Sequence, residues 1–391
     1  MGTVAAAQCT GYEEYEIRQS IKEIFKLLDI SEKFVSNGDR ILLKVNLLMG
    51  KPPEAAVTTH PVLVSALAGL LLDAGAGEVI IGDSPGGPFS KSMLKRFYSR
   101  SGLTGVAEIS SKIKLNYNTS WQKVSFSEGR VSKSFCIADF VTEADLIINI
   151  PKLKTHGLTR FTGAVKNLFG VIPGLKKGEY HFKSPEVAYF CEMLLDLAEL
   201  VKPDLNIMDA VVGMEGEGPS GGTPREFGYL LGSPAAEELD LAAAYLLGIK
   251  PLTAAPQIKR GAMRGLPSVI EELNLKGVPL KSPEDVDVPP PGGETNLLLN
   301  KLPAPLARWG EKFLKPRPVV NSNLCVGCGV CAKSCPVETI ELETVSEDDG
   351  KTNDKVSIEL ENCIRCFCCQ ELCQYEAIRI KRPLLGRIFF S

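Results

Sequence analysis

Two cysteine runs of identical spacing constrain this chain more than any other feature. Each run is Cys-x2-Cys-x2-Cys-x3-Cys, and the second follows the first at an offset of 38 residues. The runs comprise Cys325, Cys328, Cys331 and Cys335, and then Cys363, Cys366, Cys369 and Cys373. Nine of the twelve cysteines fall between Cys325 and Cys373. This clustering excludes a disulfide framework across the chain and indicates a metal-binding module built by duplication.

The spacing within each run predicts an iron–sulfur centre. Three thiolates at i, i+3 and i+6 wrap around three corners of a cubane, and the fourth cysteine reaches the other cluster. Cluster one is thus assigned to Cys325, Cys328, Cys331 and Cys373, and cluster two to Cys363, Cys366, Cys369 and Cys335. A zinc ribbon uses two Cys-x2-Cys pairs instead, so the spacing disfavours zinc.

Residues 318–382 resemble the bacterial two-[4Fe–4S] ferredoxins on the strength of these runs. Two positions depart from that family. Gln374 stands where proline usually follows the fourth cysteine, and Cys368 has no counterpart in the first run, where Val330 stands. Cys368 is interpreted as a small apolar group beside the cluster or, alternatively, as a competing ligand.

The remainder of the chain alternates strand-like and helix-like segments. Helical periodicity predicts helices over 16–28, 61–74, 187–201 and 235–247, and apolar runs predict strands over 40–48, 78–82, 144–150 and 205–209. The pattern favours an α/β class, a mainly parallel sheet with flanking helices, beside a small α+β two-cluster module. The predicted divisions are a body over 1–284, a Pro-rich linker over 285–318, the module over 319–382 and a tail over 383–391.

Polar residues follow several of the predicted strands. Lys44 and Asn46 share one face of an apolar strand, and Asp83, Ser84 and Gly86 follow the next one. Glycines let the backbone approach a ligand, and free N–H groups with a serine hydroxyl can hold an anion. The second segment reads equally well as a tight turn.

A third segment, 151–170, carries the strongest signal. It holds four cations, with apolar and small residues and no carboxylate between them: Lys152, Lys154, Arg160 and Lys166. If its strand stays extended, Lys152, Lys154 and His156 share a face. The pattern predicts a pocket for an anionic ligand, lined also by Thr162 and Asn167, in which crowded cations keep His156 neutral for proton transfer.

Carboxylates follow the last predicted strand. Asp209 ends it, and Glu215 and Glu217 lie in a Gly-rich segment. They are interpreted as acid–base or divalent-cation ligands, or as groups that orient the lysines. Because ligands of open α/β sheets bind at strand carboxyl ends, Asp209 is placed with His156, Lys154 and Lys166 among the catalytic candidates.

Seven segments together resemble the DUF362 family, which is often fused to a two-cluster ferredoxin domain. They are KVN (44–46), TTHP (58–61), GDSPGG (82–87), PKLKTH (151–156), TGAVKN (162–167), MEGEGP (214–219) and CIRCFCC (363–369). The resemblance covers about 3–382 and supports the architecture. It implies no particular reaction, because the family is named for its unknown function.

Three functions are open from the sequence. The first is a reductase that passes electrons from two [4Fe–4S] clusters to a small anionic substrate or cofactor, a flavin among the options. The second is an electron-transfer or assembly protein without chemistry of its own, and the third is a non-redox enzyme with structural clusters. A redox partner protein (ferredoxin, flavodoxin or reductase) is expected.

Charge and hydropathy exclude other classes. The 44 Lys and Arg and 47 Asp and Glu give a net charge of −3, which disfavours a nucleic-acid partner. The longest apolar stretch, 62–72, is too short for a transmembrane segment, and no secretory signal is seen. A cytoplasmic, reducing and anaerobic setting is therefore expected.

Overall fold

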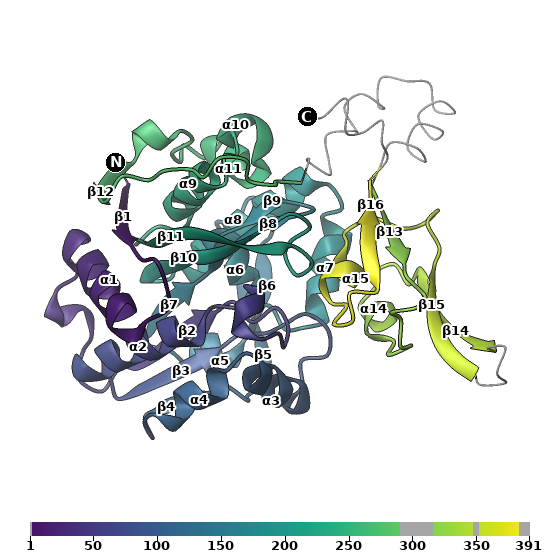
Figure 1. Cartoon of the computed structure of the whole chain (residues 1–391), viewed down its shortest axis with the longest axis horizontal. Helices are drawn as coiled ribbons and strands as arrows, with labels where there is room; N and C mark the ends of the chain where they lie inside the picture. Colours follow the sequence, from purple (N-terminus) through teal and green to yellow (C-terminus); the bar gives the residue numbers. More distant parts are fainter. Residues whose placement is uncertain (1, 290–315, 347–351, 383–391) are drawn as a thin grey trace.

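The computed structural model describes residues 2–289, 316–346 and 352–382. The body is built on one sheet with the strand order β12-β1-β11-β10-β7-β2-β3-β4, and the C-terminal module lies to one side of it (Figure 1). These strands are β12 (Asn274–Gly277), β1 (Thr3–Gln8), β11 (Thr223–Ser233), β10 (Leu205–Glu215), β7 (Leu146–Ile150), β2 (Arg40–Val45), β3 (Glu78–Gly82) and β4 (Ile113–Leu115).

The centre of the sheet is parallel and apolar. Strands β10, β7, β2, β3 and β4 pair in parallel, whereas β11 pairs antiparallel with both β1 and β10. The predicted, mainly parallel α/β fold is confirmed. Strand β10 continues to Glu215, beyond the predicted 205–209, because its long neighbour β11 supplies backbone partners as far as Thr223.

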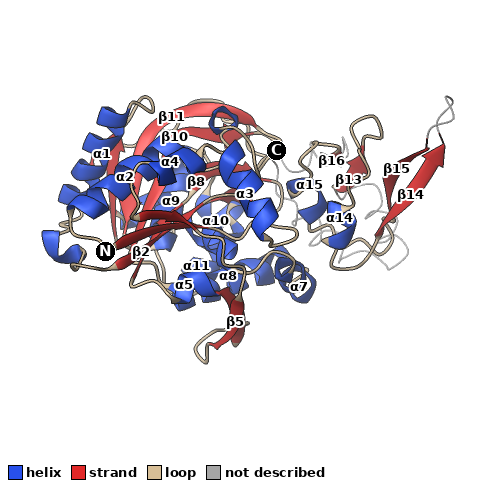
Figure 2. Ribbon diagram, turned by 90° about the horizontal axis from the view of Figure 1, so that it is seen from below, coloured by secondary structure: helices blue, strands red, loops and turns tan. Residues whose placement is uncertain are grey.

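Helices cover both faces of the sheet (Figure 2). One apolar core includes residues of α1 (Glu14–Leu27), α2 (Pro61–Asp73), α3 (Lys91–Arg100) and α4 (Leu103–Glu108). The other includes residues of α5 (Asp139–Thr142), α8 (Val187–Val201), α9 (Ala236–Leu246) and α11 (Pro256–Ala262), with α10 (Pro251–Ala254) beside α11. Strand β2 shows the division, since Ile41 and Leu43 enter the first core and Leu42 the second.

Shorter elements lead from the sheet toward the module. Strand β8 (Lys152–His156) pairs with β10 and with β9 (Arg160–Thr162), and helices α6 (Ala164–Asn167) and α7 (Lys176–Lys183) follow. A separate hairpin joins β5 (Trp121–Ser125) to β6 (Ser134–Ala138). Every residue of β8 is buried, although the strand carries two lysines and a histidine, so each polar side chain needs a partner.

The module has the duplicated fold that its sequence predicts. Its elements are β13 (Arg317–Val320), α14 (Val330–Lys333), β14 (Ile340–Ser346), β15 (Thr352–Ile358), α15 (Cys368–Glu371) and β16 (Ile378–Lys381). Val320 pairs with Ile378 between β13 and β16, and Ile340 pairs with Ile358 between β14 and β15. These two pairs are equivalent in the duplication, because Val320 corresponds to Ile358 and Ile340 to Ile378 at the 38-residue offset. Gly327 and Arg365, which are equivalent at the same offset, both have positive φ angles, of 64° and 56°.

Most of the predicted linker (285–318) and all of the predicted tail (383–391) lie outside the described residues. Within the described ranges, no helix is both long and apolar enough to cross a membrane.

Candidate functional site

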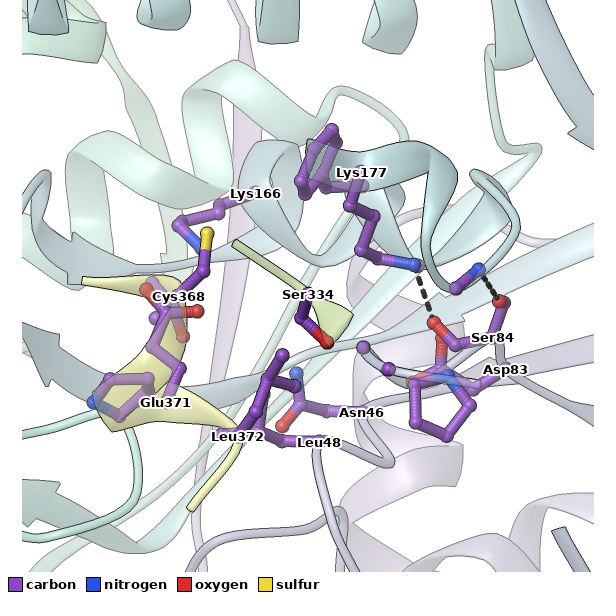
Figure 3. A pocket seen from close by; sticks show the side chains of 18 of the residues that line it. Asn46, Leu48, Asp83, Ser84, Lys166, Lys177, Ser334, Cys368, Glu371 and Leu372 are labelled. Atoms are coloured by element: carbon purple, nitrogen blue, oxygen red, sulfur yellow. Dashed lines mark hydrogen bonds between the residues drawn. The ribbon is translucent and has the colours of Figure 1, made fainter. Parts of the chain in front are cut away.

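A pocket opens between the body and the module. It encloses about 780 Å³ with its mouth included. The body contributes the loops after β2 and β3 and residues on or near β8, β9, α6 and α7. The module contributes Ser334, Cys368, Glu371 and Leu372 (Figure 3). Segments far apart in the sequence thus form a single site.

Most of the body residues predicted from the sequence line this pocket. They are Asn46, Asp83, Ser84, Gly86, Lys154, Thr162, Lys166 and Asn167. Gly86 lies tightly against the module, since a Cβ there would come within 2.3 Å of Cδ2 of Leu372. The glycine is therefore needed for close approach of the two parts of the chain.

A chain of side-chain amides supports the pocket. Lys154 Nζ donates to Asn46 Oδ1 at 2.8 Å, and Asn46 Nδ2 donates to Asn167 Oδ1 at 2.8 Å. Asn167 Nδ2 then donates to Asn149 Oδ1 at 2.7 Å, and Asn149 Nδ2 to Asn206 Oδ1 at 2.9 Å. These bonds fix the position of Lys154. Asn149 and Asn206 were missed in the sequence, although each interrupts an apolar strand and the two are paired in register.

Lys44 lies beneath the pocket and does not line it. Its ammonium is fully buried, 3.0 Å from Asp83 Oδ1, and it donates to the carbonyl oxygens of Val45 (2.7 Å) and Asn167 (2.9 Å). Burial lowers its pKa, and the charge of Asp83 opposes that shift. Lys44 thus holds the strand ends together.

The structure separates Lys152 and Asp209 from the pocket. Lys152 Nζ lies 2.9 Å from Asp209 Oδ2, and both groups also bond to the Tyr12 hydroxyl. The Tyr12 ring stacks on His60 with 3.5 Å between centroids. Although Lys152, Lys154 and His156 share one strand, Lys152 is held in this second polar cluster. The grouping of Asp209 with the other catalytic candidates is therefore not seen in the structure.

The two glutamates in the Gly-rich segment also have cationic partners. Glu215 Oε2 lies 2.9 Å from Arg225, and Glu217 pairs with Arg382 of the module. With Asp209 paired to Lys152, each carboxylate proposed for acid–base or metal chemistry is engaged by a cation. These contacts favour the interpretation that the carboxylates orient basic side chains.

His156 joins the body to the module. Its Nδ1 accepts hydrogen bonds from the backbone N–H groups of Leu158 (3.0 Å) and Thr159 (3.3 Å), so the ring proton of the neutral form lies on Nε2. Nε2 lies 2.9 Å from a carboxylate oxygen of Glu371 on α15. Burial, with the charge of Lys166, lowers the His156 pKa to about 4. The predicted neutral histidine thus acts in this structure as a contact between domains.

The remaining charges set the electrostatic character of the pocket. Burial lowers the pKa of Lys154 to about 7, helped by the charges of Lys166 and Lys152. Burial also lowers the pKa of Lys177 to about 7, and its ammonium donates to the Ser84 carbonyl at 2.6 Å. Burial alone would raise the Glu371 pKa, but Lys166 and His156 outweigh it and hold that pKa below its usual range. The pocket therefore combines partly neutralised lysines with a charged carboxylate.

His181 provides a test of this electrostatic description. Burial lowers the pKa of His181 to about 3. Below about pH 6.5 the histidine of the unfolded chain is protonated, whereas that of the folded chain stays neutral, so protonation favours the unfolded state. The free energy of unfolding should fall between pH 7 and 5, and less steeply in His181→Phe. Phenylalanine keeps the stack on Phe190, whose ring centroid lies 4.3 Å away. Urea unfolding at both pH values measures the difference, and equal losses in the two proteins would contradict the prediction.

A second cavity lies inside the module. Its lining includes Cys335, Cys363, Cys366 and Cys369, the four thiols predicted for cluster two. Thr339 N donates to Cys335 Sγ at 3.4 Å, and Ala377 N donates to Cys373 Sγ at 3.2 Å, as the duplication requires. Four thiols around a largely apolar cavity, with N–H groups on sulfur, are suitable donors for a [4Fe–4S] cluster.

Three of the thiols predicted to bind cluster one also lie near one another. Burial raises the pKa of the Cys331 thiol to about 11, and charges on Cys328 and Cys373 add to that rise, which places the three thiols near one another. Each cluster has one buried thiol, Cys331 or Cys369, but only cluster one, among the described residues, has an exposed one, Cys328. Cluster one would therefore lie closer to solvent than cluster two.

Cys368 separates the two cavities. It is buried and lines both the cavity of the predicted cluster-two ligands and the pocket between the domains. Figure 3 shows its side chain in the wall of the pocket, which Lys166 also lines. The sequence singled out this thiol as unmatched in the first run, and the structure places it between the predicted cluster and any pocket ligand.

Comparison with known proteins agrees with both parts of the chain. A family model described as a domain of unknown function (DUF362) matches residues 41–245, and a 4Fe-4S dicluster domain model matches 324–377. The chain belongs to the DUF362 family. A thylakoid-associated protein of Synechocystis is 34% identical over 293 residues, which cover 73% of this chain and 86% of that protein. The predicted family resemblance is thereby confirmed.

Other relatives match more narrowly. Ferredoxin-1 of Caulobacter vibrioides is 48% identical over 42 residues, which cover 11% of this DUF362 chain and 34% of that protein. Among solved structures, the lactate racemase apoprotein of Thermoanaerobacterium thermosaccharolyticum aligns with a TM-score of 0.40 and 11% identity, over 63% of this chain and 57% of that one. The C-terminal module of this DUF362 protein is a ferredoxin-type domain, which supports [4Fe–4S] binding and electron transfer.

Proposed function

We propose that this DUF362 protein is a reductase that delivers electrons from two [4Fe–4S] clusters to a ligand held between its domains. The observation that carries the proposal is the position of Cys368, which lines both cavities. Ser334 and Cys368 each face the pocket and each precede a predicted cluster-two ligand, Cys335 and Cys369. A ligand in the pocket would thus lie one layer of side chains from cluster two.

The protein's own residues would bind the ligand and exclude water. The Ser84 hydroxyl accepts from Gly174 N at 2.8 Å, which closes one wall. Lys154 and Lys177, with pKa values near 7, are suited to give up or take protons at neutral pH. When bound, the clusters supply one electron each, and two protons would complete a two-electron reduction of the ligand.

The exposed side of the module suits an electron donor. Cys328 is exposed, and the apolar side chain of Val326 beside it is 55% exposed. A ferredoxin, flavodoxin or reductase that docks over cluster one would supply electrons to the site. This division gives the two halves of the duplicated module different roles, one facing the donor and one facing the ligand.

Reoxidation kinetics test the proposal. Anaerobic protein reduced by dithionite is mixed with a panel of organic acceptors, and bleaching and recovery of the cluster absorbance are followed. An acceptor that raises the melting temperature should also reoxidise the clusters. In Cys363→Ser, which lacks a predicted cluster-two ligand, cluster one should remain reducible while reoxidation by that acceptor slows at least tenfold.

Two outcomes would contradict the proposal. In the first, acceptors bind in the pocket but do not reoxidise the clusters, whereas partner proteins reoxidise them. That result would favour an electron-transfer protein without chemistry of its own. Alternatively, Cys363→Ser could react as fast as the unmodified protein, which would remove cluster two from the electron path. Lys176→Met, which alters an exposed lysine paired with Glu179, is the control.

A further inference from the structure

Within the described part of the chain, one cation of the pocket has no hydrogen-bond or ion-pair partner. Lys154 donates to Asn46 Oδ1 and to the Val57 carbonyl oxygen, both at 2.8 Å, and Lys177 donates to the carbonyl oxygens of Ser84 and Ile172. Lys166 also lines the pocket, yet it has no hydrogen bond or ion pair within residues 2–289, 316–346 and 352–382. Its ammonium is therefore free to bind an anion.

An acidic side chain also lines the pocket. Glu371 lies there, and one of its carboxylate oxygens is 2.9 Å from His156 Nε2, the ring nitrogen that carries the proton. A polyphosphate would bring several negative charges against this carboxylate with one free ammonium to meet them. The balance of charges favours a ligand with a single negative group.

The rest of the pocket is suited to an apolar molecule. Leu48, Phe169, Leu175 and Leu372 line it, and Lys177 Nζ lies over the Phe169 ring, 5.6 Å from the ring centroid. Besides Glu371, the module contributes a hydroxyl group to these walls. The Ser334 hydroxyl is buried and has no hydrogen-bond partner among the described residues, so it is available to a ligand.

From this arrangement we propose that the ligand is a largely apolar organic carboxylate. Its carboxylate binds Lys166, its body packs along Phe169 and Leu372, and a polar atom further along receives or gives a hydrogen bond at Ser334. This inference rests on the proposed reductase function and names the class of molecule that the same site would take. Nucleotides and flavin phosphates belong to the excluded class, because they carry two or more negative charges.

Matched probes test the ligand class on the cluster-loaded protein. Cinnamate and cinnamamide share shape and differ in charge, so titration calorimetry of the pair isolates the anion contact. Cinnamate should bind at least tenfold more tightly than cinnamamide, as expected for a charge-assisted hydrogen bond in a partly buried site. Lys166→Met should abolish this preference, Lys166→Arg should retain it, and the control Lys176→Met should leave it unchanged.

Several results would overturn the ligand class. They are an unchanged cinnamate preference in Lys166→Met, no cinnamate binding to the unmodified protein, or tighter binding of flavin mononucleotide or ATP than of cinnamate. None of these depends on electron transfer. A flavin that binds more tightly than cinnamate and reoxidises the clusters would refute the carboxylate class and leave the reductase function intact. Cinnamate binding without reoxidation of the clusters by any acceptor would support the carboxylate class and refute the reductase function.

Discussion

Replacing Cys335 by serine is expected to remove the second cluster and spare the first. In the duplicated module the fourth cysteine of each run serves the other cluster, and Cys335 lines the cavity of Cys363, Cys366 and Cys369. Iron should fall from about eight to about four atoms per chain. The spectrum of the remaining cluster should match that of Cys363→Ser, because both changes empty the same cavity.

Complementary variants make this test decisive. Cys373→Ser should match Cys325→Ser and leave the other cluster, since its sulfur is assigned to cluster one. Cys136→Ser, outside the module, is the control and should keep all of the iron. If Cys335→Ser instead gave the spectrum of Cys325→Ser, the exchange of fourth ligands would be refuted. Cys368→Ala should keep both clusters, and loss of one would make Cys368 a ligand.

Replacing Lys44 by methionine is expected to destabilise the body by about 3–5 kcal/mol, the usual cost of breaking a buried ion pair from one side. Lys44 is fully buried and Asp83 is 4% exposed, so the carboxylate would be left without its counter-charge. The carbonyl oxygens of Val45 and Asn167 would each lose a donor as well. Urea unfolding followed by circular dichroism measures the loss.

A double variant separates charge from packing. Lys44→Met with Asp83→Asn removes both charges, and it should recover a substantial part of the stability lost in Lys44→Met alone. Lys91→Met, at an exposed position at the start of α3, should change the free energy of unfolding by no more than about 0.5 kcal/mol. A Lys44→Met protein as stable as this control would contradict the structural role.

Local patterns predicted four helices and four strands of the body, most of them with small errors in their bounds, and did not predict others such as β1, β11, α3 and α4. Strand β3 and helix α8 have the predicted bounds, because an uninterrupted apolar run and a helical period with a following proline mark their ends. The duplicated cysteine spacing likewise predicted a module whose halves repeat residue by residue. Strand β10 was predicted too short because its extension depends on pairing with β11, which is a tertiary contact.

The site was predicted in part for the same reason. Lys154, Lys166 and Asn167 were found because they lie within one segment, and a cluster of cations without acids is visible in the sequence. The contributions of Ser334 and Glu371 were not found, because they come from a module more than 160 residues further along the chain. Strand periodicity and residue spacing also could not show that Lys152 forms an ion pair with Asp209 whereas His156 contacts Glu371.

Because the pocket is lined by both the body and the cluster-binding module, its affinity for a ligand should depend on the supply of iron. Glu371 and Cys368 lie on α15, the short helix that carries Cys369, and the apolar core of the module is small and largely made of the cysteines themselves. A domain of that kind depends on its metal for its fold. A chain that has lost its clusters to oxygen or iron starvation would lack the pocket wall formed by Ser334, Cys368, Glu371 and Leu372, so we expect it to bind its ligand more weakly than the cluster-loaded chain does.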